Sequence, residues 1–103
     1  MAHTLSVTSV GQNDIRIVCK NKSTIDKISS WYQQLTKQKV KEVNSKYVNV
    51  ITLDSARKDK VFNSIDAEII ISDFILSIGY RIIETGQLNV RQASLNRILF
   101  ISQ

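Results

Sequence analysis

The stretch from Ser64 to Gly79, SIDAEIIISDFILSIG, is the longest apolar concentration in the chain and constrains its fold the most. It opens with a helix-start pattern and closes on a glycine, which predicts one helix. At about 100° per residue its apolar side chains form two stripes on different sides of that helix. The first stripe holds Ala67, Ile71, Phe74, Ile75 and Ile78, and the second holds Ile65, Ile69 and Leu76. A helix of this kind needs burial on two sides, so we expect the domain or an interface to be built on it.

The chain has 103 residues, of which 43% are hydrophobic and 22% are charged. These values predict one globular domain over residues 1–103 and argue against disorder. No apolar run is long enough to cross a membrane, and the first residues lack the charged and apolar regions of a secretory signal. With Cys19 as the only cysteine, an internal disulfide is excluded. We therefore expect a cytoplasmic protein in a reducing compartment, without a membrane span.

The sequence of the first half predicts a β-hairpin followed by a helix. Residues 4–10 and 15–19 alternate apolar and polar around the turn residues 11–14, as half-buried strands do. Ser23-Thr24-Ile25-Asp26 has the spacing of a capping box, and an apolar stripe follows it. That stripe consists of Ile25, Ile28, Tyr32 and Leu35. We expect this helix to end near Gln38, with residues 37–46 running into a loop.

The second half supplies the remaining strands. Residues 47–53 are rich in β-branched and aromatic side chains, and residues 60–62 fit a short return strand. After Gly79, residues 80–85 read as a strand, Gly86-Gln87 begins a connection, and residues 95–101 form the last strand. The sequence thus predicts an α+β fold: a two-layer sandwich with a mainly antiparallel sheet of about five or six strands and two helices on one face, in the order ββαβ(β)αββ.

Catalytic and cofactor patterns are missing from the sequence. His3 and Cys19 are the only residues of their types, too few for a zinc site, and Cys19 falls on the inward side of a predicted strand. Asp66 and Asp73 share a helix side, but nothing in the sequence marks an apolar pocket that would raise a carboxyl pKa. None of the three glycines lies in a phosphate-binding motif. We expect no enzyme activity, no cofactor and no metal.

The net charge of +5 lies entirely in the first half: residues 1–52 hold eight Lys or Arg against three acids, and residues 53–103 hold six against six. Such asymmetry favours an anionic partner. The lysines concerned surround the first predicted helix and are Lys20, Lys22, Lys27, Lys37, Lys39, Lys41 and Lys46. They could release counterions from a phosphate backbone, with Trp31 as the better candidate for an exposed aromatic; a solvated lysine face is the alternative.

Apolar surface in excess of one buried face is the second functional signal. A protein partner or a second copy would cover it, or the chain's own hairpins wrap around the second helix. The sequence favours a non-enzymatic binding or regulatory module that acts through protein contacts and forms a homodimer. Its predicted interface anchors are Trp31, Ile65, Ile69 and Leu76, with Lys37, Lys39 and Lys41 as a charged rim. The rival hypothesis is a small nucleic-acid-binding protein that uses the lysine-rich face of residues 20–46.

Overall fold

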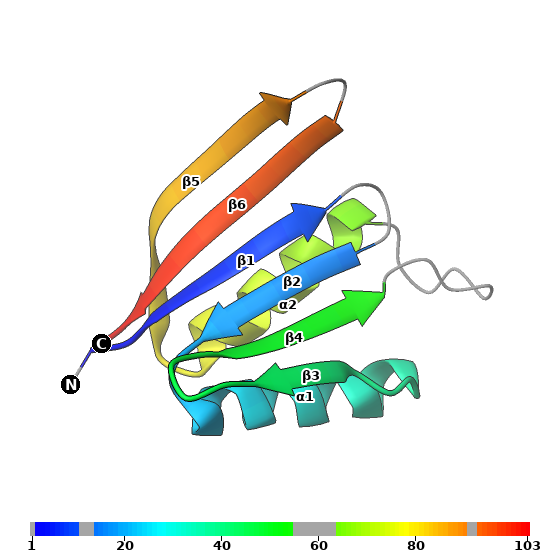
Figure 1. The fold of residues 1–103 in the computed structure, drawn as a ribbon, viewed down its shortest axis with the longest axis vertical. Coiled ribbons are helices and arrows are strands. Elements are labelled where there is room, and N and C mark those ends of the chain that lie inside the picture. Colours follow the sequence, from blue (N-terminus) through cyan, green and yellow to red (C-terminus); the bar gives the residue numbers. More distant parts are fainter. Residues whose placement is uncertain (1, 11–13, 55–63, 91–92) are drawn as a thin grey trace.

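The computed structural model describes the backbone of residues 2–10, 14–54, 64–90 and 93–103, and their side chains except at 10, 54, 64–66, 88–90 and 93–95. Eight elements follow one another along this part of the chain: β1 (Thr4–Val10), β2 (Asp14–Cys19), α1 (Lys22–Thr36), β3 (Lys41–Asn44), β4 (Asn49–Asp54), α2 (Ser64–Ser77), β5 (Tyr80–Val90) and β6 (Ala93–Ser102). All neighbouring strands pair antiparallel in one sheet of order β3-β4-β2-β1-β6-β5 (Figure 1). The predicted α+β fold is confirmed.

Both helices cover the same face of the sheet, which lies behind the strands in Figure 1. Alternate residues of the inner strands point to that face and are fully buried, for example Leu5 on β1, Ile17 on β2 and Ile51 on β4. Helix α1 packs Ile25, Ile28 and Tyr32 against them, and α2 packs Ala67, Ile71 and Ile75. The apolar side chains that recur at every second residue of the strands and at every third or fourth residue of the helices therefore form a single apolar layer.

Helix α1 begins at Lys22, and its N-cap is Asn21, two residues before the predicted N-cap Ser23. The side chain of Asn21 accepts hydrogen bonds from the backbone N–H groups of Ser23 and Thr24, at 3.0 and 3.4 Å, and so caps the helix. The capping role predicted for Ser23 is therefore wrong. The helix ends at Thr36, where Lys37 adopts a left-handed conformation and donates its backbone N–H to the Gln33 carbonyl.

The strands differ from the sequence prediction in several places. Strand β4 begins at Asn49, two residues after the predicted start at Tyr47. Lys41–Asn44, predicted as loop, forms β3 at the edge of the sheet and pairs with β4. Strand β5 continues through Gly86-Gln87, where a connection was predicted, and runs to Val90. The predicted return strand at residues 60–62 lies outside the described residues. At Gly79 the prediction is confirmed, since its φ of +102° is a conformation that glycine adopts without steric cost.

Candidate functional site

Helix α2 keeps large apolar side chains on the side that faces away from the sheet. Ile69 is 55% exposed and Leu76 is 41% exposed, while Ile71 and Ile75 on the inner side are fully buried. Ile69 and Leu76 are seven residues apart, so they lie on one side of the helix about two turns from each other. The side chain of Ile65, predicted as the third member of this stripe, lies outside the described residues.

Strand β5 adds two more exposed isoleucines directly after α2. The turn at Gly79 brings Tyr80 into the core, and Ile82 and Ile83 follow with exposed fractions of 43% and 45%. The register shifts between Ile82, opposite Phe100, and Glu84, opposite Leu99, which leaves Ile83 as the extra residue of a bulge. The bulge accounts for Ile83, whereas Ile82 is opposite the buried Phe100 and is exposed on the last strand of the sheet.

The backbone of β5 completes this surface. β5 is the last strand of the sheet order, so its outer edge has no strand partner within the described part of the chain. Such an edge presents a row of free N–H and C=O groups that a further strand can pair with. We call Ile69, Leu76, Ile82 and Ile83, together with the outer edge of β5, the α2–β5 surface. Sequence reasoning identified its two helix residues and missed its two strand residues.

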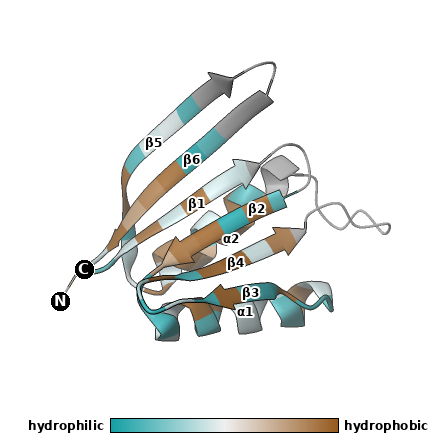
Figure 2. Cartoon of the chain, in the orientation of Figure 1, coloured by the Kyte–Doolittle hydropathy of each residue, from teal (hydrophilic) through white to brown (hydrophobic). Residues whose placement is uncertain are grey.

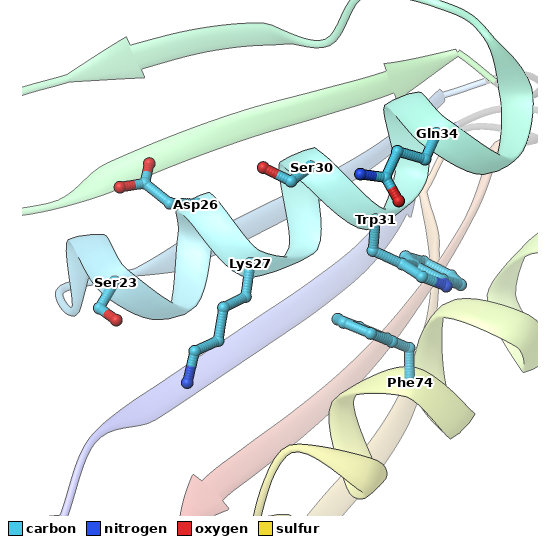
Figure 3. A pocket seen from close by; sticks show the side chains of 7 residues that line it. All are labelled: Ser23, Asp26, Lys27, Ser30, Trp31, Gln34 and Phe74. Carbon is cyan, nitrogen blue, oxygen red and sulfur yellow. The ribbon is translucent and has the colours of Figure 1, made fainter.

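Trp31, the other predicted anchor, lies between the two helices. Its ring stacks on that of Phe74 with 4.3 Å between centroids and an angle of 8° (Figure 3). It also meets the Tyr32 ring edge-on, with 6.1 Å between centroids. The side chain is half-buried and forms one wall of an open hollow of about 750 Å³. The hollow is lined by Ser23, Asp26, Lys27, Ser30, Trp31, Gln34 and Phe74. Trp31 thus joins α1 to α2 and exposes only part of its ring.

The seven predicted lysines separate into groups. Lys20 and Lys22 lie at the start of α1. Lys46 lies near them because it shortly precedes Asn49 of β4, whose side chain donates hydrogen bonds to the carbonyls of Cys19 and Lys20. Lys37 and Lys39 lie near its end, about 22 Å away along a helix of this length, and Lys41 begins β3, next to the Glu42 that contacts Lys22. Lys27 borders the hollow between the helices. The described lysines therefore span the length of α1.

Two of these lysines have close partners. Lys22 forms salt bridges with Asp26 and Glu42, which raise the pKa of the Lys22 ammonium. The same contact, with help from Asn44, lowers the pKa of the Glu42 carboxyl. Lys46 holds its ammonium 5.7 Å from the centre of the exposed Tyr47 ring, within the range of a cation–π contact. Lys22 is therefore partly neutralised by acids of its own chain.

A small polar cluster is buried beneath the start of α1. The Tyr80 hydroxyl lies 2.8 Å from the Thr24 hydroxyl and 3.9 Å from the Cys19 sulfur. Burial raises the pKa of the Tyr80 phenol, because the phenolate would lose its hydration. Cys19 is fully buried, as its inward strand position predicted. Among the described residues, no three His, Cys, Asp or Glu side chains gather into a potential metal site, and no helix is long and apolar enough to cross a membrane.

Comparison with known proteins gives a likeness of fold. No protein-family model matches this sequence, and no curated protein matches it. Eleven chains of solved structures match, among them the crystal structure of a conserved kinetoplastid-specific protein from Trypanosoma cruzi, with a TM-score of 0.64 over 100% of both chains and 7% sequence identity. The shared feature is the fold. At this identity the likeness carries no information about ligand, partner or activity.

Proposed function

We propose that this protein is a small non-enzymatic binding module that self-associates through its α2–β5 surface. The observation that carries the proposal is the exposure of Ile69 and Leu76 on the outer side of α2, which is followed along the chain by an edge strand with two exposed isoleucines. Isolated apolar residues are normal on protein surfaces, but four on two consecutive elements, next to free backbone groups, are typical of an interaction site.

A second copy of the chain suits this surface because the outer edge of β5 can pair with the same edge of the other copy. The exposed apolar side chains can likewise pack against their counterparts. Pairing of β5 with β5 of another copy would satisfy the outer backbone groups of both strands in an antiparallel arrangement. The apolar side chains of the two copies would then leave water together, which supplies about 25 cal/mol for each Å² buried. A different protein with an exposed strand and apolar residues is the other partner that this surface would accept.

Sedimentation velocity over a wide range of protein concentration tests the proposal. We expect the weight-average sedimentation coefficient of the wild type to rise with concentration, and Leu76→Glu to abolish that rise. Leu35→Glu is the matched control, because Leu35 lies on α1 and is 44% exposed, close to the 41% of Leu76. A wild type that stays monomeric at the highest concentration, or an equal effect of both substitutions, would contradict self-association through this surface.

A further inference from the structure

The face of the sheet opposite the helices carries an ordered arrangement of charge. This open face is turned toward the viewer in Figures 1 and 2, and in Figure 2 its strands carry hydrophilic segments between hydrophobic ones. Its residues are the strand positions that alternate with the buried ones, such as Thr8 between Val7 and Ser9, or Arg16 between Ile15 and Ile17. Each of these alternate positions therefore points away from α1 and α2.

One row of residues crosses the open face through all six described strands, and half of its members are cations. The strand register places each member opposite the next, in the order Lys41, Thr52, Arg16, Thr8, Arg97 and Gly86. Lys41, Arg16 and Arg97 are exposed and come from every second strand, so they repeat at about 10 Å. Thr52 and Thr8 place hydroxyl groups between them. We call this set the cationic row.

A second row runs beside the cationic row, two residues away along each strand, and we call it the apolar row because four of its six members are apolar. Its members, again in register, are Val43, Val50, Val18, Ser6, Leu99 and Glu84. Residues i and i+2 of a strand are about 7 Å apart, so every cation has an apolar neighbour on the same face. Among the side chains that the structure describes, two acids also face this side, Asp14 at the start of β2 and Glu84 on β5, and Arg81 opposite Ile101 adds a fourth cation.

From these two rows we propose that the open face binds single-stranded nucleic acid laid across the strands. The phosphates would lie along the cationic row, where arginine and lysine pair with their charge and threonine hydroxyls donate hydrogen bonds. Bases and sugars would rest on the apolar row. A duplex keeps its base faces stacked inside, whereas a single strand exposes them next to its phosphates, so only the single strand uses both rows.

This site differs from the lysine-rich face of residues 20–46 that the sequence suggested. Of those seven lysines only Lys41 belongs to the cationic row, whereas Arg16 and Arg97 come from the central part of the sheet. The site also lies on the opposite side of the sheet from the helices. A variant that cannot self-associate, such as Leu76→Glu, should therefore bind nucleic acid as the wild type does, so that the two proposals fail independently.

Fluorescence anisotropy of a labelled oligouridylate, titrated at several salt concentrations, tests the site. With three phosphates neutralised, we expect log K to fall with log salt at a slope of about −2, since each contact to a single strand contributes about −0.7. Arg16→Gln with Arg97→Gln should flatten the slope by about 1.4 and weaken binding. Lys27→Gln with Lys37→Gln removes the same charge from α1 and from the residue that follows it, and should leave the slope unchanged.

A gain-of-function variant keeps the test independent of any loss of folding. A side chain at Gly86 would meet no atom within 4 Å, and Gly86 ends the cationic row on β5. Gly86→Lys should therefore tighten binding and steepen the slope by about 0.7. Equal slopes for the wild type and the double arginine variant would overturn the proposal. So would a larger loss in the α1 lysine variant, or binding of the matching duplex or of polyglutamate as tight as that of the oligouridylate.

Discussion

Helix α1 turns polar side chains outward and α2 turns apolar ones outward, although both pack on the same face of one sheet. The exposed positions of α1 are mostly charged or polar, with Leu35 in its last turn as the exception. On α2 the corresponding positions include Ile69 and Leu76. The inner sides of both helices hold fully buried isoleucines. Their difference is therefore confined to the outer side, where it does not serve the core, and this is why we relate α2 to binding.

If the inner sides of the two helices are packed equally well, removing a core side chain from either helix should lower the free energy of unfolding by the same amount. Ile28→Ala in α1 and Ile71→Ala in α2 both empty fully buried positions, and each should lower the free energy of unfolding by about 2–5 kcal/mol. Urea denaturation followed by circular dichroism measures both losses. A loss below about 1 kcal/mol for Ile71→Ala alone would break the comparison, because α2 would then be packed more loosely than α1.

The ring stack between the helices should couple them energetically. In a double-mutant cycle of Trp31→Ala and Phe74→Ala, we expect a coupling of about 0.5–1.5 kcal/mol in unfolding free energy, as found for aromatic pairs. Trp31→Ala combined with Ile69→Ala is the control, because Ile69 lies on the outer side of α2, and its effects should add within about 0.5 kcal/mol. Additive effects for both pairs would show that the stack does not join the helices.

The start of α1 is tied to the strand that follows α2 by the Tyr80–Thr24 hydroxyl pair. Tyr80→Phe leaves the buried Thr24 hydroxyl without this partner and should cost about 1–3 kcal/mol of unfolding free energy. Adding Thr24→Val should restore part of that loss. If Tyr80→Phe is neutral at pH 7, this tie contributes nothing to the packing of α1.

The raised pKa of Tyr80 adds a pH dependence with a definite sign. Its contribution to stability is present below the pKa of an unfolded tyrosine, about 10, and is lost as the pH rises through the higher folded pKa. Alkaline titration of the unfolding free energy should therefore fall less steeply in Tyr80→Phe than in the wild type. Identical alkaline profiles would contradict the burial of this phenol.

The smallest effect concerns the salt bridge that holds the start of α1 to β3. Because Lys22 lowers the pKa of Glu42, the contribution of this carboxyl is present above its unfolded pKa and is lost as the pH falls through the folded one. Glu42→Gln should remove a small part of the acid dependence of the melting temperature. Lys22→Met should remove the same part, and the double variant should show no further change. Additive changes would mean that the two groups act separately.

The sequence predicted correctly those helices and strands that bury one side, because burial of one side produces a regular spacing of apolar residues. The spacing of Ile25, Ile28 and Tyr32 predicted the inner side of α1, and all three are buried. Leu35 belongs to the same spacing but is exposed, because the helix ends one residue later at Thr36. Strand β3 was missed since every residue of KEVN is exposed or half-buried, so its sequence lacks the alternation that marks a covered strand.

The candidate site was predictable only in part for a related reason. A second apolar stripe on α2 could be read from the sequence, but whether the chain itself would cover it depends on tertiary packing. Ile82 and Ile83 gave no signal as surface residues, because an apolar pair in a strand usually has one member in the core. Ile83 is the extra residue of a bulge and Ile82 lies on the last strand of the sheet, and both bulges and strand order depend on the pairing of distant segments.

Hydrogen exchange measured at low and high protein concentration tests self-association through the α2–β5 surface most directly. In the monomer the outward N–H groups of β5 exchange without a partner, and pairing with a second copy would protect them. We predict that raising the concentration slows exchange in Tyr80–Val90 and leaves α1 unchanged, and that Leu76→Glu removes this protection. Protection that falls on α1, or exchange in β5 that is independent of concentration, would contradict the account.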